Sequence, residues 1–409
     1  MSMIGPTFFS SFGSEFGSEP APGSNEPSAA FVGPTGVGFT MALCRIDDGR
    51  MLLLYGNNAD DTTVTGVVLT VSGATITWGT PVNIAVGSSF THVWSARQLN
   101  AATDEFVVCG RYNESSIYVR VIEISGSTIT TPNALYTHTP GTSLFRGHMG
   151  VLSPTQLGLI YTPASGSISG LAATVASGVV TFGTAVAMAT TGSANLRTND
   201  SPPAVTSGAM TIWFDMYDGV SLTNLNACKF SFSGTVTTIG TPWMQASPGD
   251  RFLRHPTTGF GTMAQRSLGS ATMTMLYRDS GTGDIAETSG EFSSGVTGSY
   301  ANSGSSPSFI LGAPPNPYAP PPVDKLTGVS GAVNPAFSHY SVVYLVSQAV
   351  YLYTRSTAPA GQMSANIATL VASQAGNTIH EYVKSHKGVL VYRNSVTTTL
   401  TALVISGMN

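Results

Sequence analysis

A Ser-Gly pair returns along the chain at nearly constant intervals, and it usually interrupts an apolar, β-branched run. The pairs are Ser72-Gly73, Ser125-Gly126, Ser177-Gly178, Ser233-Gly234, Ser289-Gly290 and Ser406-Gly407. The first five are separated by 53, 52, 56 and 56 residues, and the last follows after 117 residues. A strand-rich repeat with a period of roughly 40 to 50 residues is typical of propellers built from four-stranded blades. The repeat therefore predicts an all-β chain folded into a single β-propeller.

Each Ser-Gly pair lies in the turn of a predicted hairpin. In the copy at 67–80, an apolar run meets the turn and an alternating strand follows, which ends on Gly-Thr. The copies around Ser177 and Ser233 repeat this form closely, whereas the copy around Ser289 is weaker. Glycine suits the turn because it adopts a positive φ without steric cost.

A second repeated element is a short apolar strand upstream of each hairpin. Seven copies occur, at 51–55, 106–109, 157–161, 211–214, 273–277, 349–353 and 388–392. A strand that is apolar on both faces lies between two layers, as the second strand of a blade lies between neighbouring blades. Seven copies predict seven four-stranded blades. The alternatives are a β-solenoid, which needs shorter repeats, and a β-sandwich, which does not need seven equivalent units.

The chain is expected to close its ring with an N-terminal latch strand, because the last hairpin has its turn but no strand after it. Between the strands at 273–277 and 349–353 the spacing stretches, and the excess is rich in proline, which predicts a surface loop. The next spacing is short, so we expect the sixth blade to lack a strand. The predicted organisation is a latch strand at 1–10, a Gly/Ser/Pro linker at 11–36, five blades at 37–301, a Pro-rich loop at 302–325 and two blades at 326–409.

Composition excludes several classes of protein. Only 9% of the residues are charged, the net charge is −4, and no basic run occurs, which argues against a nucleic-acid binder. No apolar stretch approaches the roughly 20 residues of a membrane helix, and the start of the chain lacks the features of a signal peptide. Three cysteines (Cys44, Cys109 and Cys228) fall in separate strand-like runs, which predicts buried apolar residues rather than disulfides or a zinc site. We expect no metal and no cofactor.

Arginine, histidine and other polar residues recur in the segments that enter the predicted innermost strands. If these segments open on one face of the ring, their side chains would converge there, with arginine donating to carboxylate, phosphate or hydroxyl groups and Trp94 stacking on a sugar or base. The alternative is that they tie adjacent blades together. The candidates for this ligand face are His92, Trp94, Arg97, Arg146, His148, Arg197, Asp200, Arg251, Arg254 and His255.

No catalytic constellation emerges from the sequence. Sialidases are propellers with an arginine cluster, but their Ser-Xaa-Asp-Xaa-Gly boxes are absent here. Glycoside hydrolysis needs two facing carboxylates, and nothing singles out the pair Asp200 and Glu381. The acidic turns at 57–61 and 215–219 do not follow the spacing of a calcium loop and are read as solvated turns. The sequence thus predicts a protein that is not an enzyme.

With these residues laid out, the apolar strand, Ser-Gly turn and Gly-Thr ending resemble the propeller repeats of tailed-bacteriophage virion proteins, most clearly at Ser72, Ser177 and Ser233. The resemblance implies a structural component of the tail, baseplate or fibre, made in the host cytoplasm and carried in the virion. It would assemble with other virion proteins through 302–325 and 11–36, and would contact host-surface glycans. A stand-alone sugar-binding lectin is the alternative, and a propeller glycosidase comes third.

Overall fold

The computed structural model describes residues 26–57, 62–163 and 167–188 and, between 193 and 407, the strands given below with a few adjoining turns. All regular elements among these residues are β-strands. No helix long and apolar enough to cross a membrane occurs in this part of the chain.

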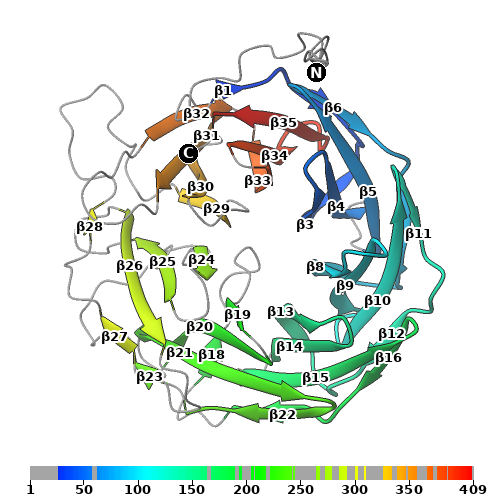
Figure 1. The fold of residues 1–409 in the computed structure, drawn as a ribbon, viewed down its shortest axis with the longest axis vertical. Helices are drawn as coiled ribbons and strands as arrows, with labels where there is room; N and C mark the ends of the chain where they lie inside the picture. Colours follow the sequence, from blue (N-terminus) through cyan, green and yellow to red (C-terminus); the bar gives the residue numbers. More distant parts are fainter. Residues whose placement is uncertain are drawn as a thin grey trace, which may run out of the picture.

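The strands form seven sheets arranged around a common centre, as the sequence predicts (Figure 1). We number these sheets as blades in chain order. Blade 1 contains β3 (Val37–Asp47), β4 (Arg50–Asn57), β5 (Thr63–Ser72), β6 (Thr75–Trp78) and β7 (Val82–Val86). Blade 2 contains β8 (His92–Asn100), β9 (Glu105–Tyr112), β10 (Ser116–Ser125), β11 (Thr128–Thr130) and β12 (Tyr136–His138). Blade 3 contains β13 (Leu144–Ser153), β14 (Gln156–Pro163), β15 (Ser169–Ala176), β16 (Val179–Phe182) and β17 (Val186–Ala187).

The remaining blades complete the ring. Blade 4 contains β18 (Ser193–Asn195), β19 (Ala204–Thr206), β20 (Ala209–Tyr217), β21 (Leu222–Ser233), β22 (Val236–Ile239) and β23 (Trp243–Met244). Blade 5 contains β24 (Ala264–Ser267), β25 (Thr272–Arg278), β26 (Ile285–Phe292), β27 (Tyr300–Asn302) and β28 (Ser308–Phe309). Blade 6 contains β29 (Leu326–Val333), β30 (His339–Val346), β31 (Ala349–Ser356) and β32 (Asn366–Val371). Blade 7 contains β33 (Ala375–Lys384), β34 (Lys387–Asn394) and β35 (Leu400–Ser406), joined by β1 (Glu26–Pro27) and β2 (Phe31–Val32).

The second strand of a blade packs against both neighbouring blades. On β4, Leu52 and Leu54 join a buried cluster with blade 2, while Met51 and Leu53 join a cluster with blade 7. The alternating side chains of β9 divide in the same way between blades 1 and 3. Because successive side chains of a strand point to opposite faces, a continuous apolar run buries both faces. This confirms the prediction of a strand between two layers.

The outermost strand of most blades is split in two, and in blades 1, 3 and 4 the break falls at the Gly-Thr ending of the repeat. In blade 1, β6 and β7 both pair with β5, and the backbone N–H of Gly79 between them donates to Val68 O at 2.8 Å. In blade 3 the N–H of Gly183 donates to Ala172 O at 2.8 Å. A Cβ at Gly183 would lie only 1.8 Å from Thr235 O, in the Ser-Gly turn of blade 4. Glycine is therefore needed where the break in the outermost strand of one blade contacts the Ser-Gly turn of the next blade.

The ring closes through residues near the N-terminus. Strands β1 and β2 pair antiparallel with β35, and the bond from Ser28 N to Val404 O lies between their two stretches of pairing. These strands lie inside the segment 11–36, so the prediction that this whole segment is a linker is wrong. The predicted latch at 1–10 lies outside the described residues. Two-residue strands with mostly exposed side chains leave almost no periodic signal in the sequence.

Two predictions about blades 5 and 6 also need correction. The predicted second strand at 349–353 belongs to β31, the third strand of blade 6, and β30 is the second. Blade 6 has four strands, so it does not lack one. Part of the predicted loop 302–325 forms β28, which pairs with β26 at the outer edge of blade 5. Residues 310–325 lie outside the described residues.

The close approach of Gly183 to the next blade can be tested with a matched pair of glycine variants. We expect Gly183→Ala to lower the free energy of unfolding by roughly 1–3 kcal/mol, because the added methyl group must push the two blades apart. Gly49→Ala is the control, since its Cβ would lie 3.6 Å from the nearest atom, Val71 O. Urea denaturation measures both, and equal stability of the two variants would contradict the packing role of Gly183.

Candidate functional site

Five of the predicted ligand-face residues lie in the described part of the chain. His92, Trp94 and Arg97 lie on the innermost strand β8, and Arg146 and His148 lie on the innermost strand β13. His92 pairs with Arg111 of β9 and Arg146 pairs with Thr162 of β14, which puts both at corresponding positions of neighbouring blades. The other five (Arg197, Asp200, Arg251, Arg254 and His255) lie outside the described residues.

Trp94 and His148 turn away from solvent. Trp94 is 3% exposed and lies in the apolar cluster between blades 2 and 3. Its ring covers the backbone of Gly147, where a Cβ would lie 2.4 Å from the indole. The prediction that Trp94 stacks on a ligand is therefore wrong, since it joins two blades instead. His148 is also buried.

An exposed aromatic residue, Phe90, lies in the loop that leads from β7 to β8. The residue is 49% exposed, and its backbone φ is 34°. A positive φ is strained for an aromatic residue with a Cβ, and such strain persists only where the surroundings enforce it. The equivalent loop of the next blade, 139–143, has no aromatic residue. Phe90 is thus not part of the repeated packing scheme.

Arg111 and His92 form a polar base beside Phe90. The Arg111 guanidinium carbon lies 5.6 Å from the centroid of the Phe90 ring, a cation–π distance. Arg111 Nη1 donates to Leu144 O at 2.8 Å, which ties it to blade 3. Its Nη2 lies 2.9 Å from His92 Nδ1, and since a guanidinium only donates, the imidazole accepts. These contacts fix the guanidinium in the junction between two blades.

Asn113 holds the loop that carries Phe90. Its Oδ1 accepts the backbone N–H of Ser88 at 2.7 Å and that of Ser89 at 3.4 Å. Gly87 makes this approach possible, because a Cβ there would lie 2.5 Å from the same Oδ1. Phe90, His92, Arg111 and Asn113 together are called the Phe90 site. Sequence reasoning found only His92, although a Gly-Ser-Ser-Phe loop before an innermost strand is a visible signal.

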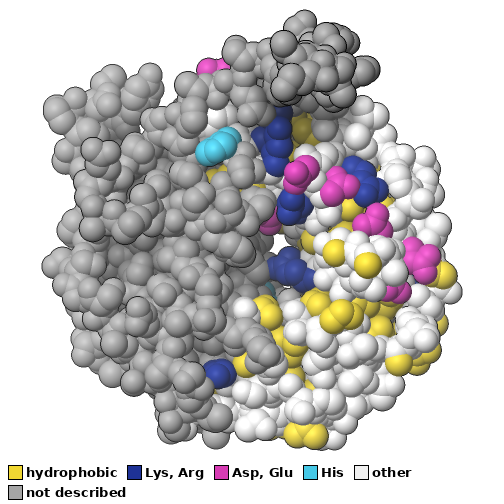
Figure 2. Space-filling model, viewed as in Figure 1, with side chains coloured by type: hydrophobic (Ala, Val, Ile, Leu, Met, Phe, Trp, Pro, Cys, Tyr) yellow, Lys and Arg dark blue, Asp and Glu magenta, His cyan; other side chains and the backbone are white. Residues whose placement is uncertain are grey.

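A second polar group lies on the innermost strands toward the β3–β4 turn, at the other end of β8. Arg45 of β3, Arg97 of β8 and Glu381 of β33 come from three consecutive blades, and we call them the axial cluster. The space-filling view shows an opening at the centre of the ring, with Lys and Arg side chains beside it over β3 and β8 (Figure 2). Arg45 Nε donates to Val383 O at 2.8 Å, and Arg97 Nη1 donates to Ala96 O at 2.8 Å.

Glu381 has an unusual environment for a carboxyl group. It lies on the innermost strand β33 and is partly exposed to solvent. Burial raises the pKa of Glu381 to about 7, against the opposing effects of the Tyr382 backbone N–H, Arg97 and Arg45. The carboxyl group therefore titrates near neutral pH, as carboxyl groups do when desolvation outweighs nearby positive charge.

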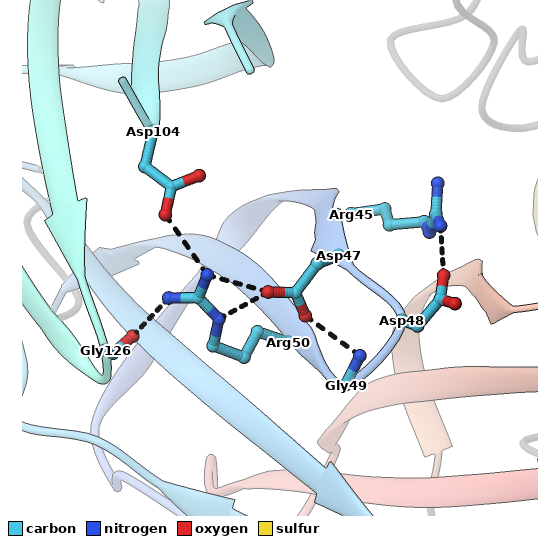
Figure 3. A network of polar contacts seen from close by, with 7 residues as sticks. All are labelled: Arg45, Asp47, Asp48, Gly49, Arg50, Asp104 and Gly126. Atoms are coloured by element: carbon cyan, nitrogen blue, oxygen red, sulfur yellow. Dashed lines mark hydrogen bonds and ion pairs between the residues drawn. The ribbon is translucent and has the colours of Figure 1, made fainter. Parts of the chain in front are cut away.

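Arg50, the first residue of β4, has structural partners. Arg50 donates from Nε to Asp47 Oδ2 at 2.7 Å, from Nη2 to Asp104 Oδ2 at 3.1 Å and from Nη1 to Gly126 O at 2.8 Å (Figure 3). Gly126 lies in the Ser-Gly turn of blade 2, so this network ties blade 1 to its neighbour. In the described residues, no group of three or more His, Cys, Asp or Glu side chains is placed to hold a metal ion.

The tie from Arg50 recurs around the ring. Gln156, the first residue of β14, donates to Gly234 O at 2.9 Å in the Ser-Gly turn of blade 4. Lys387, the first residue of β34, donates to Gly73 O at 3.1 Å in the turn of blade 1. A donor at the start of the second strand thus repeatedly holds the next blade's turn. Among the described residues, the Phe90 site and the axial cluster are two polar groups that this repeated contact does not explain.

Comparisons with known proteins find likenesses in solved structures alone. No protein-family model matches the chain, and no curated protein matches it either. A Lactobacillus plantarum protein is 11% identical over 84% of this chain and 87% of its own, with a TM-score of 0.49. A fungal lectin, the six-bladed β-propeller from Aleuria aurantia, is 15% identical over 83% of this chain and 98% of its own, with a TM-score of 0.45. The β-propeller domain of the Trilobed protease from Pyrococcus furiosus is 6% identical over 92% of this chain and 98% of its own, with a TM-score of 0.45. With TM-scores below 0.5, these likenesses assign neither a family nor a ligand to this chain.

The raised pKa of Glu381 predicts how stability depends on pH. The folded state favours the protonated carboxyl, so this contribution to stability is complete below the ordinary pKa of 4.5 and is lost as pH rises to about 7. His138 acts in the opposite direction, because burial lowers its pKa, so its contribution is complete above the ordinary pKa of 6.5 and is lost as pH falls below it. Only the difference between wild type and a Glu381 variant therefore isolates this carboxyl group.

Thermal unfolding of wild type and Glu381→Gln across this range is the measurement. We expect the variant to gain stability relative to wild type as pH rises from about 4.5 to about 7. A difference between the two proteins that stays constant with pH would contradict the raised pKa.

Proposed function

We propose that this propeller is a non-catalytic carbohydrate-binding ring and that the Phe90 site is one of its binding surfaces. The observation that supports it best is the exposed ring of Phe90, held at a positive φ beside a fixed guanidinium. A structure that strains its backbone to present an apolar ring to solvent gains nothing in packing from it. Strain of this kind is a recurrent feature of ligand-binding sites.

The chemistry of the Phe90 site suits a sugar. A pyranose presents apolar C–H groups on its faces and hydroxyl groups around its edge. Phe90 offers a flat apolar surface, and Arg111, His92 and the Ser88–Ser89 segment offer polar groups within the same few residues. Binding sites for small molecules combine aromatic surface with a few well-placed polar groups in this way. Hydroxyl groups both donate and accept, so they match a mixed set of partners.

Other ligand classes fit the chain less well. Nucleic acid needs a basic surface, whereas the net charge here is −4 and only 17 residues are Lys or Arg. Hydrolysis of a glycosidic bond needs two carboxylates across the substrate, and the described loops around Phe90 contribute Glu114 alone. We therefore propose binding without catalysis.

The Phe90 site is not repeated in the next blade, and this limits the affinity that a single chain can reach. One shallow site with a single aromatic ring binds weakly, so useful avidity would come from several copies of the chain acting together. A virion that carries many copies would supply this multivalency. The assignment to a phage tail, baseplate or fibre stays a prediction from the resemblance of the repeats, with 302–325 and 11–36 as its docking segments.

A glycan array with the full chain, followed by calorimetry on the best ligand, tests the proposal. We expect Phe90→Ala to weaken binding by roughly three- to tenfold, the value of one aromatic contact, and Phe90→Trp to retain binding. Val236→Ala on β22 is the matched control, since Val236 is an exposed apolar side chain away from the site. Wild type that binds no glycan would overturn the proposal, and so would a Phe90→Ala variant that binds as well as wild type.

A further inference from the structure

We propose that the axial cluster is a second binding site, which takes an oxyanion between Arg97 and Arg45 in competition with Glu381. The site lies on the innermost strands of blades 7, 1 and 2 and is independent of the Phe90 site. Its ligand is a sulfate, phosphate or carboxylate group, either free or attached to a sugar.

The register of the strands brings the cluster together. Glu381, Cys44 and Arg97 pair with the third residues of β34, β4 and β9, so they occupy the same level of three consecutive blades. Arg45 follows Cys44 on β3 and points back toward blade 7, where its Nε donates to Val383 O. From these positions the Arg97 and Arg45 guanidinium groups both act electrostatically on the Glu381 carboxyl group.

The guanidinium groups have donors beyond those that the fold uses. Arginine carries five N–H donors, and among the described residues the Arg97 side chain donates only to its neighbour's carbonyl, Ala96 O. Arg45 donates to Val383 O and to the exposed carboxylate of Asp48. A planar fork with unused donors suits an oxyanion, which accepts two parallel hydrogen bonds.

Glu381 is the natural counter-charge, yet it forms no ion pair in the described part of the chain. Arg45 pairs with Asp48, and Arg50 pairs with Asp47 and Asp104. The hydrogen bond to the Glu381 side chain comes from the backbone N–H of Tyr382 at 2.9 Å. The carboxyl group thus balances the guanidinium charge from a distance and leaves their donors to a ligand.

Protonation of Glu381 would strengthen the site. An anion in the cluster disfavours a neighbouring carboxylate, so binding and proton uptake by Glu381 support each other. Cys44 stays neutral, because burial raises its pKa to about 11. The strands packed against β33 are β3, β29, β30 and β34. Besides Glu381 and Cys44, the ionisable residues of β33 and these four strands are Arg45, Asp47, His339, Tyr340, Tyr344, His380, Tyr382, Lys384, Lys387, Tyr392 and Arg393. Strand β29 contributes none of them.

Isothermal titration with sulfate and with glucuronate tests the proposal, because the charge of both is constant around neutral pH. We expect saturable binding that Arg97→Gln weakens about tenfold or more, the value of one charge-assisted hydrogen bond. Arg97→Lys should retain part of the affinity. Lys229→Gln on β21 removes a positive charge away from the axis and should change nothing. Binding of sulfate alone indicates an inorganic anion, and binding of both indicates an acidic sugar.

The Glu381→Gln variant gives a result that loss of structure cannot imitate. We expect it to bind sulfate more tightly than wild type above pH 7 and to lose the rise in affinity that wild type shows as pH falls through about 7. The proposal is overturned if wild type shows no saturable binding, if Arg97→Gln binds as wild type does, or if Glu381→Gln binds less tightly. Phe90→Ala should leave sulfate binding unchanged, which separates this proposal from the carbohydrate site.

Discussion

Face-to-face packing of neighbouring blades is the interaction on which the rest of this structure depends. Blades 1, 2, 3 and 7 each contribute a second strand whose alternate side chains enter two different apolar clusters, as Leu52 and Leu53 do on β4. A single sheet of this kind cannot bury its own faces, so each blade is stable only between two others. The ring follows from this requirement, because a closed circle is the arrangement in which no blade is left with an apolar face uncovered.

Closure imposes the second constraint, since the outer parts of the blades must approach one another closely. The Gly-Thr break of one blade meets the Ser-Gly turn of the next, where Gly183 leaves no room for a side chain beside Thr235. A donor at the start of the second strand then holds the same turn, as Gln156 does with Gly234 O. Both parts of the repeat that are visible in the sequence therefore serve contacts between blades rather than contacts within one blade. This explains why the contacts between blades need few charged residues, which make up only 9% of the chain.

The parts of the fold that repeat could be predicted, and the parts that occur once could not. The apolar second strands carry a strong signal, because burial on both faces demands a continuous apolar run. In blade 6, β30 and β31 are both apolar and rich in tyrosine, so the sequence does not say which of them is second. Strands β1 and β2 gain their conformation from β35 and show no periodicity of their own. Among the predicted site residues, Trp94 misled because an aromatic residue in an innermost strand serves packing as readily as binding. Arg111 was missed because it lies near the end of β9, a second strand whose apolar run predicts a buried core element.

The two candidate sites lie toward opposite ends of one strand, and this position decides how they can interact. His92 begins β8 and Arg97 lies five residues further on, or roughly 17 Å along an extended strand. Substitutions separated by more than about 7–10 Å without shared partners usually act independently. The strand between the sites is paired along its length with β9 and packed between blades 1 and 3, so it has no second arrangement through which one site could influence the other. A ligand shorter than this separation that carries both an acidic group and a neutral sugar face therefore cannot occupy both sites of one chain at once.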